Sequence, residues 1–300
     1  MDGIILINKE KEWTSHDVVA KVKKLLNVKV GHTGTLDPNA TGVLPLLLGN
    51  ATKISKYLIN HDKEYIAELK LGVKTDTADG EGKILEEKPV DLEKKFIKDE
   101  KLKENLQKVL DTFIGKSLQK PPIYSAIKVN GKKLYEYARE NKEINIKPRE
   151  IEIYDIKLLK IDLNENVITF KVKCSKGTYI RTLCESIAEK LDTCGYMKEL
   201  QRTQVGEFKI EDSITISRLE EKVRSKEILN SKKNKYFISI EQLFSNCKEI
   251  KLNTEQINKY LNGVKINNNN IDGIYRIYNE NKFIGLGINK DKKLKRDIVI

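Results

Sequence analysis

The sequence predicts an α+β fold, in which helices flank a mixed, largely antiparallel sheet and a small β-rich module follows at the C-terminus. Strand and helix patterns do not alternate strictly, as they would in a doubly wound parallel sheet. Two long strand-like stretches, 148–162 and 166–175, follow one another directly. Near the C-terminus, the apolar pieces 273–279 and 282–289 lie on either side of the turn-like NENK, which is typical of a hairpin.

The N-terminal half begins with a strand and a capped helix. GIILIN, residues 3–8, is a continuous apolar run typical of a buried strand. Thr14 or Ser15 can cap the helix that follows, in which valines and leucines return at helical spacing. Residues 51–60 fit a second helix, and residues 64–72 alternate as a strand that ends in the turn-rich TDTADGEG.

The second half predicts two further helices and a domain boundary. A basic, polar helix is expected over roughly 99–113, and another over 178–191, directly after the paired strands. The Lys-, Ser- and Asn-rich stretch 224–238 is typical of a linker or an exposed loop. We therefore predict a large domain over 1–235 and a small one over 236–300.

Composition favours a polyanionic partner, nucleic acid first, and a cytoplasmic location. The 300 residues carry a formal net charge of +12, which favours polyanionic partners, although a codon bias toward Lys and Asn explains part of it. The N-terminus lacks a secretion signal, and no apolar run approaches the length of a membrane span. The four cysteines form no C-x-x-C pair, as expected for reduced thiols.

The sequence lacks the motifs of several common kinds of enzyme chemistry. The sequence has no P-loop, no dinucleotide fingerprint and no nucleophile elbow. Its three histidines are too scattered for a zincin site, and DTADGEG does not fit a calcium-binding EF-hand loop. We therefore expect no cofactor and no metal, so that any chemistry is carried by protein side chains alone.

The stretch GHTGTLDPNATGVL, residues 31–44, presents a single carboxylate, Asp37, on a loop rich in small residues. Asp-Pro commonly opens a turn, so a purely structural role is one interpretation. The flanks favour a second one, because Leu36 and Pro38 offer the carboxylate no hydrogen-bonding side chain. The glycines would let the backbone approach another surface closely. An Asp presented in this way suits a nucleophile or a proton acceptor.

This loop resembles the catalytic motif of the TruB family of tRNA pseudouridine synthases, which convert uridine 55 in the T loop of tRNA. Four further blocks resemble the family in the same order, at 63–82, 119–139, 174–191 and 197–208. The resemblance covers about residues 3–215 and implies the pseudouridine synthase fold. Residues 240–300 resemble the family's small RNA-binding module of the PUA type more weakly.

The resemblance assigns catalytic roles to three residues. Asp37 would be the essential carboxylate, which attacks the base at C6 or the sugar at C1′, or abstracts a proton from C2′. Arg181 would hold this carboxylate and oppose the rise in its pKa on burial. Tyr65 would lie against the target base as the candidate for removing the C5 proton. Asp76 and Asp79 are expected to shape their turn, or to contact RNA.

The resemblance also implies a set of substrate-binding residues. Tyr179 would line the pocket, Leu200 would form an apolar wall, and His32 would help to displace the flipped nucleotide. A basic segment with interleaved tyrosines, 119–147, would clamp the T arm as an insertion in the catalytic domain. Lys128 and Arg139 are its candidate RNA contacts; a solvated basic helix is the plainer interpretation.

One part of the opening motif departs from the family. The family usually has Pro and then Gly after the lysine, where this chain has Glu10 and Glu12. This puts the local turn geometry in question, but it does not touch the proposed catalytic groups.

Three other functions are compatible with parts of the sequence. A tRNA-binding folding chaperone would use the same positive charge without needing Asp37 opposite Arg181. The guide-RNA-dependent branch of the family uses partner proteins and a larger C-terminal module, whereas this chain resembles the stand-alone bacterial type. That type implies a monomer with no guide RNA and no obligate protein partner. A scaffold with a turn-forming Asp-Pro would explain the loop but not the other blocks.

Overall fold

The computed structural model describes residues 1–90, 101–140, 142, 144–225 and 234–300, and the chain divides into two compact units. The first unit contains Met1–Pro38, Val43–Ile59 and Phe208–Ile300, and the second contains Asn39–Gly42 and Asn60–Glu207. Both units combine helices with mainly antiparallel strands. The predicted α+β class is therefore confirmed.

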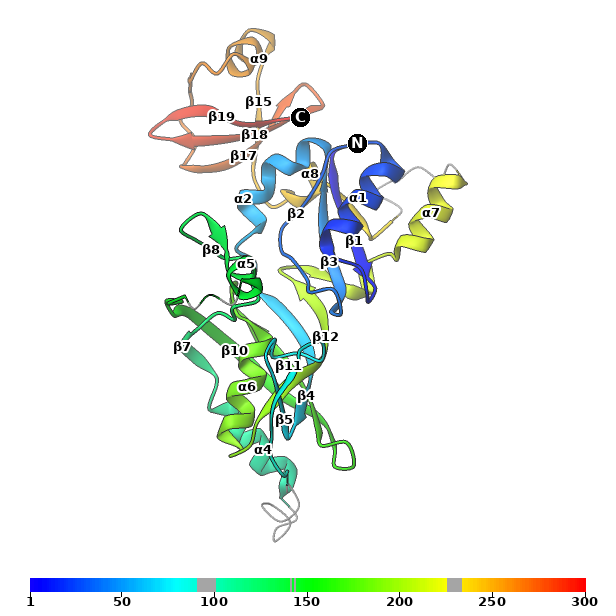
Figure 1. Ribbon diagram of the computed structural model, residues 1–300. Coiled ribbons are helices and arrows are strands. Elements are labelled where there is room, and N and C mark those ends of the chain that lie inside the picture. Colours follow the sequence, from blue (N-terminus) through cyan, green and yellow to red (C-terminus); the bar gives the residue numbers. More distant parts are fainter. Residues whose placement is uncertain (91–100, 141, 143, 226–233) are drawn as a thin grey trace. The chain divides into compact units, whose positions relative to one another are not determined.

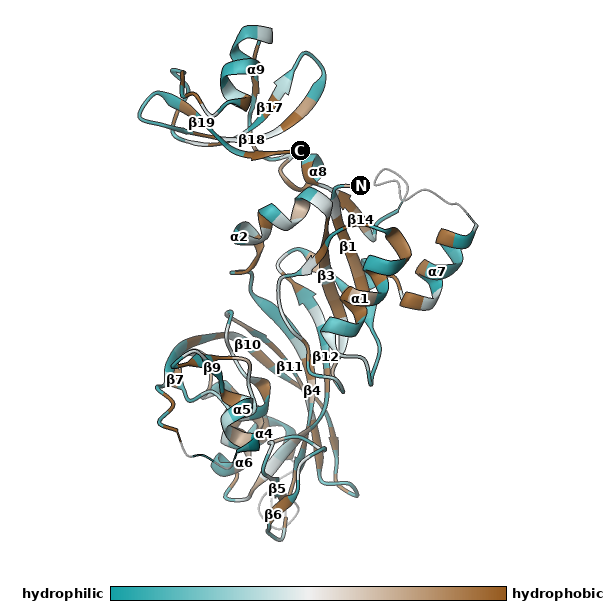
Figure 2. Cartoon of the chain, turned by 45° about the horizontal axis from the view of Figure 1, so that its top comes forward, coloured by the Kyte–Doolittle hydropathy of each residue, from teal (hydrophilic) through white to brown (hydrophobic). Residues whose placement is uncertain are grey.

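A small group of strands forms the centre of the N-terminal part of the first unit. Strands β14 (Phe237–Ser239), β1 (Gly3–Lys9) and β3 (Thr41–Leu48) lie side by side in this order, and β2 (Val30–His32) pairs with β3. Figure 2 shows that β1 and β3 are hydrophobic along most of their length. Nearly every residue in them is buried, which is why these strands read as continuous apolar runs.

Helix α1 (Ser15–Leu26) packs against these strands. Its N-cap is Thr14, whose hydroxyl accepts a hydrogen bond from the Asp17 amide at 3.1 Å. The Asp17 carboxylate accepts one in return from the Thr14 amide at 2.9 Å, which completes a capping box. Val18 and Val22 join the apolar residues of β1, β3 and α7 (Ile216–Arg224) in one core cluster. The predicted strand and capped helix are both confirmed.

The helix expected over 51–60 is only partly present. Residues Gly49–Ile54 form a 3₁₀ segment, and the α-helix α2 (Ser55–Leu58) has a single turn. The Thr52 hydroxyl donates a hydrogen bond to the carbonyl of Gly49, three residues back, at 2.9 Å. Such local bonds compete with the i→i−4 ladder of an α-helix and favour the tighter turn.

The C-terminal part of the first unit is the predicted β-rich module. Its sheet has the order β15 (Glu249–Lys251), β17 (Gly273–Asn279), β18 (Lys282–Lys290), β19 (Lys293–Val299) and β16 (Ile266–Asn267). Helix α9 (Thr254–Leu261) buries Ile257 and Tyr260 against this sheet. The Tyr260 hydroxyl donates to the carbonyl of Leu286 at 2.7 Å, so its one polar atom is satisfied. The hairpin predicted around NENK is formed by β17 and β18.

The second unit is built on a long antiparallel sheet. Its order is β12 (Gly195–Val205), β4 (Lys63–Leu71), β11 (Val167–Cys174), β10 (Arg149–Asp162) and β7 (Gly115–Gln119). The two strands predicted from 148–162 and 166–175 are β10 and β11, and they pair directly. Along β4, odd-numbered residues from Tyr65 to Leu71 are buried and even-numbered ones are only partly covered, so one face of the sheet carries the core.

Two helices cover this sheet (Figure 1). Helix α6 (Ile180–Lys190) packs against β12, and α4 (Leu102–Asp111) packs against β10. Both helices were predicted. The start expected for α4, near residue 99, lies outside the described residues. Among the helices of the described residues, none has the length and apolar character that crossing a membrane requires.

The glycine at position 42 permits close strand pairing inside the second unit. Residues 41 and 42, at the start of β3, pair in parallel with residues 201 and 202 of β12. A Cβ atom at Gly42 would lie 2.2 Å from the carbonyl oxygen of Arg202, and its φ of +109° suits only glycine. The expectation that loop glycines allow close approach holds here, whereas a Cβ at Gly31 would meet nothing closer than 3.6 Å.

The remaining elements are short. They are β5 (Val73–Thr75), β6 (Ile84–Glu87), β8 (Lys128–Val129), β9 (Lys132–Lys133), α5 (Leu134–Arg139), β13 (Phe208–Lys209), a 3₁₀ turn at Ile210–Asp212 and α8 (Ile240–Leu243). Strand β5 pairs with β6, and β8 pairs with β9. Most of the linker predicted over 224–238 lies outside the described residues.

Candidate active site

The Asp37 loop connects β2 to β3 and is anchored on both sides of the carboxylate. Leu36 is buried, and its amide and carbonyl both bond to the Ser15 hydroxyl, at 2.9 and 3.1 Å. On the other side, the carbonyl of Pro38 accepts a hydrogen bond from the Lys9 ammonium at 2.7 Å. Asp37 itself is half-buried. Its neighbours therefore hold the backbone while the side chain keeps access to the surface.

Lys9 ties this loop to the turn that precedes α1. Its side chain is fully buried, and besides Pro38 its ammonium donates to the carbonyls of Glu10 at 3.0 Å and Trp13 at 2.7 Å. A buried ammonium has three donors and is tolerated when they are satisfied. Here they join two chain segments, so the turn and the Asp37 loop are held together.

His32 is the last residue of β2, where it pairs with Leu46. Its ring meets the ring of His16, at the start of α1, edge to face with a centroid distance of 5.8 Å. Both histidines and Asp37 belong to the first unit.

Tyr65 and Leu200 lie on one face of the second unit's sheet. Leu200 of β12 is directly opposite Ala67 of β4, and Arg202 is directly opposite Tyr65. Residues opposite one another in an antiparallel pair share a face, as do residues two apart on one strand. All four are buried. The structure therefore brings the predicted base-facing tyrosine and the predicted apolar wall together, with an arginine beside them.

The Arg202 side chain bonds to the Tyr65 hydroxyl. Arg202 is 1% exposed, and its burial lowers the pKa of the guanidinium, while the tyrosine opposes that change. Lys63, two residues before Tyr65, also has a lowered pKa, first because of burial and then because of the Arg202 charge. Positive charge is thus concentrated beside Tyr65.

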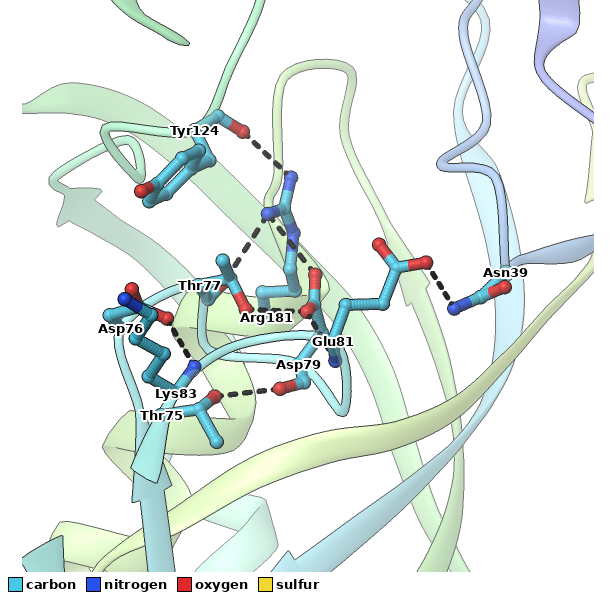
Figure 3. A network of polar contacts seen from close by, with 9 residues as sticks. All are labelled: Asn39, Thr75, Asp76, Thr77, Asp79, Glu81, Lys83, Tyr124 and Arg181. Atoms are coloured by element: carbon cyan, nitrogen blue, oxygen red, sulfur yellow. Dashed lines mark hydrogen bonds and ion pairs between the residues drawn. The ribbon is translucent and has the colours of Figure 1, made fainter. Parts of the chain in front are cut away.

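Arg181 is the centre of a second polar network, shown in Figure 3. One of its nitrogens donates to the carbonyl of Thr77 at 3.2 Å and lies 3.4 Å from the Asp79 carboxylate. Another donates to the carbonyl of Tyr124 at 2.9 Å. Arg181 is 7% exposed. It is therefore fixed by two separate loops.

The same network orders the turn that contains Asp79. The Thr77 hydroxyl donates to the Asp79 carboxylate at 2.5 Å, and the Thr75 hydroxyl to the Asp79 carbonyl at 2.7 Å. Asp76 accepts from the Lys83 amide at 2.8 Å. The prediction that Asp76 and Asp79 shape the turn is confirmed, but the ion pair of Asp79 with Arg181 was not foreseen (Figure 3).

Tyr179 is held at the start of α6, where it is the N-cap residue. The side chain of Gln119, at the end of β7, accepts from the Tyr179 amide at 2.8 Å and donates to its carbonyl at 3.0 Å. Gln119 is buried. This pair of bonds sets the position of the tyrosine and, with it, the first turn that carries Arg181.

The candidate RNA clamp is a hairpin followed by a short helix. Strands β8 and β9 form the hairpin, and α5 contains two of the tyrosines. The Arg139 guanidinium lies 5.3 Å from the ring centre of Tyr135, and the Tyr137 hydroxyl donates to the carbonyl of Val129 at 3.1 Å. Lys128 and Arg139 are both exposed. The described part of this segment is thus a hairpin and a short helix rather than one basic helix, and its contact with RNA stays a prediction.

No group of His, Cys, Asp and Glu that could hold a metal ion is found among the residues that the structure describes.

Comparison with known proteins decides the family. Residues 22–180 match the TruB family pseudouridylate synthase N-terminal domain, and 181–245 match the tRNA pseudouridylate synthase B C-terminal domain. Residues 249–295 match the C-terminal domain of pseudouridine synthase II TruB. The chain belongs to the TruB family.

Curated TruB-family relatives match over nearly the whole chain. The tRNA pseudouridine synthase B of Clostridium kluyveri is 45% identical, with 98% of each chain covered. The enzyme of the same name from Clostridioides difficile is 43% identical over 96% of this chain and 94% of its own.

Solved structures agree with the fold. A chain of a Cbf5-Nop10-Gar1 complex has a TM-score of 0.67 at 25% identity, covering 99% of this chain and 83% of that one. A chain of an H/ACA RNP bound to a substrate RNA containing 2′-deoxyuridine has a TM-score of 0.66 at 24% identity, with the same coverage. The pseudouridine synthase fold with its PUA-like module is therefore confirmed.

The TruB-family departure at Glu12 has a structural consequence. Glu12 has a φ of +67°, the left-handed region in which glycine is favoured. The turn geometry is thus one that the family's glycine would adopt without strain, and the bonds of Lys9 to the carbonyls of Glu10 and Trp13 hold the turn on either side of Glu12.

We expect Glu12→Gly to stabilise the protein. Relief of the left-handed backbone outweighs the greater freedom of glycine in the unfolded chain, for a net gain of about 0.5 to 1 kcal/mol in the free energy of unfolding. Urea denaturation of the two proteins measures this. Glu10→Gly, in the same turn, provides the control and should not stabilise; equal effects of both changes would contradict the explanation.

Sequence reasoning missed Arg202, and it named Asp79 only as a turn residue or an RNA contact, not as the partner of Arg181. Both lie inside the motif blocks quoted above, but an Asp in a turn and an Arg in a basic chain are ordinary. For Arg202 a signal existed, since it lies two residues after Leu200 and therefore on the apolar side of the strand. A charged residue at an apolar position is rarely buried unless it is paired.

Proposed function

We propose that this protein isomerises uridine 55 in the T loop of tRNA to pseudouridine, without a cofactor. The observation that carries the proposal is the match, over nearly the full length of both chains, to relatives named tRNA pseudouridine synthase B. The Asp37 loop supports it as well. Its backbone is anchored on both sides of Asp37, so the carboxylate is presented in a defined position, as catalysis requires.

The reaction breaks the bond from N1 to C1′, turns the base and joins C5 to C1′. Substrate and product contain the same atoms, so the balance needs no redox carrier and no phosphate donor. Asp37 provides the carboxylate, by attack at C6 or C1′ or by removing a C2′ proton. The target nucleotide must leave its stack to reach it, at a cost of a few kcal/mol. Loop nucleotides are the accessible ones.

The second unit supplies the surroundings of the base. Tyr65 lies against it and accepts the C5 proton, and Leu200 forms an apolar wall on the same sheet face. Tyr179 lines the pocket from the start of α6, whereas His32 helps to displace the flipped nucleotide. Arg181 supplies the positive charge that keeps the Asp37 carboxylate ionised.

The segment 119–147 clamps the T arm. Its exposed Lys128 and Arg139 contact phosphates, and its tyrosines stack on bases or support the cations. We further propose that the protein works alone, as a monomer without guide RNA. Relatives with the tRNA enzyme's name are 40–45% identical, whereas the chains from H/ACA assemblies are at 24–25%.

Release of tritium from C5 tests this function. Unmodified tRNA labelled with tritium at C5 of its uridines is expected to release tritium to water, about one tritium for each tRNA. The same transcript with cytidine at position 55 is the control and should lose none. Tight binding without release would identify a tRNA-binding chaperone instead, and release from the control would place the modified uridine elsewhere.

A further inference from the structure

Arg202 is a fully buried arginine on β12, in the centre of a sheet, where a buried charge is unusual. It is one of the largest fully buried side chains of the described residues, and most of the others are apolar. Burying a guanidinium costs several kcal/mol unless its donors are satisfied. An apolar residue would fill the same place at no such cost, so a use for the charge is expected.

The partner that the structure gives this charge is the hydroxyl of Tyr65. The two residues are directly opposite one another on β12 and β4, and the guanidinium bonds to the phenol oxygen. Gly42 lets β3 approach the backbone of Arg202 closely, which fixes the strand that carries it. Tyr65 is 9% exposed, so this bond is little weakened by water.

We propose that Arg202 is a positioning residue for Tyr65, which holds the phenol in place and favours its ionised form, so that Tyr65 can accept the C5 proton. This rests on the proposed function. A free tyrosine has a pKa near 10 and is a poor base at neutral pH. A charged donor on its oxygen stabilises the phenolate relative to the phenol.

The step balances without a further reactant. Once C5 is joined to C1′, the C5 proton passes to the phenolate oxygen, and the electron pair of the C–H bond returns to the pyrimidine ring. Tyr65 then gives the proton to water, and N1 takes up a proton from water. Arg202 gains and loses nothing, which suits a group that remains protonated.

The effect of Arg202 on Tyr65 has to be distinguished from the effects of other titratable groups near this sheet face. Lys63 and Asp62 lie beside Tyr65 on or next to β4, and Lys176 follows β11. Arg181 and Cys184 lie on α6, and Cys174 lies on β11. Burial raises the pKa of the Cys174 thiol to about 12 and that of Cys184 as well, so both are neutral. Lys63 can titrate, so a probe on Tyr65 itself is needed.

The first measurement follows Tyr65 in the protein without RNA. Tyrosine labelled with carbon-13 at the hydroxyl-bearing ring carbon is titrated by NMR, and the Tyr65 signal is identified by its loss in Tyr65→Phe. We expect Tyr65 to ionise at lower pH in the wild type than in Arg202→Gln, by about one pH unit or more, which is the effect of one charged hydrogen bond. Arg202→Lys should fall between them.

The second measurement is the pH profile of tritium release. Arg202→Gln is expected to be about tenfold slower at neutral pH and to recover as the pH approaches the tyrosine range. Glu64→Gln is the matched control: Glu64 accepts from Thr203 at 2.8 Å and pairs with Lys171 at 2.9 Å, next to Tyr65 and Arg202 on the same strands. Its profile should keep the wild-type shape.

Each outcome decides the question. An Arg202→Gln protein that is folded, with an unchanged Tyr65 titration or an equal loss at every pH, overturns the proposal in favour of a structural role. If neither Arg202 variant folds, the wild-type titration decides alone, since ionisation of Tyr65 at or above about pH 10 excludes the stabilised phenolate. Absence of release by the wild type contradicts the proposed function, whereas the Tyr65 titration stands independently of it.

Discussion

Asp37→Asn is expected to abolish tritium release from tRNA while leaving the fold intact. Asn has nearly the shape of Asp but cannot carry the negative charge that attack on the base or sugar, or proton abstraction, requires. Removing the group that performs the chemistry costs at least about a thousandfold in rate. Release at fixed enzyme excess, followed over long times, measures the loss.

The bonds that anchor the loop explain why the fold should survive this substitution. The loop is held by Ser15 on the Leu36 backbone and by Lys9 on the carbonyl of Pro38, and none of these bonds uses the Asp37 side chain. Thr35→Ala, on the same loop and exposed, is the matched control and should keep full activity. Activity of Asp37→Asn within tenfold of the wild type would remove Asp37 from the mechanism.

Arg181→Met is expected to lower both activity and stability. The change leaves the carbonyls of Thr77 and Tyr124 and the carboxylate of Asp79 without the group that bonds them. Breaking a buried pair of this kind costs about 3 kcal/mol in the free energy of unfolding. Tritium release should fall at least about a hundredfold, because the proposed function assigns to Arg181 the positive charge that keeps the Asp37 carboxylate ionised.

Two further variants separate the stability effect from the catalytic one. Arg218→Met, on α7, removes an arginine whose side chain is 68% exposed and lies 3.9 Å from Glu221, and it should change stability by less than about 0.5 kcal/mol. Asp79→Asn keeps the size of the side chain while removing its charge, so it should cost less stability than Arg181→Met. Urea denaturation and tritium release are compared across the three. A stable but inactive Asp79→Asn would link the ion pair to catalysis, whereas a fully active Arg181→Met would exclude Arg181 from it.

Local patterns account for most of the secondary structure that the sequence predicted. β1 is a continuous apolar run, and Thr14 caps α1 through a box with Asp17. Both depend on side-chain burial and on hydrogen bonds within a few residues, so the local sequence is enough to predict them. The helix expected over 51–60 was shortened because the Thr52 hydroxyl bonds the backbone three residues back, a competition that periodicity does not register.

The candidate site could be predicted only in part, because only some of its residues lie in local patterns. The motif blocks located Asp37, Tyr65 and Arg181, because each lies in a long run of characteristic residues. Their partners could not be found in this way. Asp79 meets Arg181, and Arg202 meets Tyr65, across separations of more than a hundred residues.

The sequence by itself determined where the single carboxylate is presented, which segments are apolar enough to be buried, and the family to which the motif blocks belong. Only the tertiary structure decided which strand lies beside which and in what register. That pairing places a buried guanidinium on the hydroxyl of Tyr65 and a buried ammonium, that of Lys9, under the Asp37 loop. Hydrophobic periodicity specifies the face that a residue occupies, whereas hydrogen-bond partners across strands and loops depend on chain packing over the whole unit.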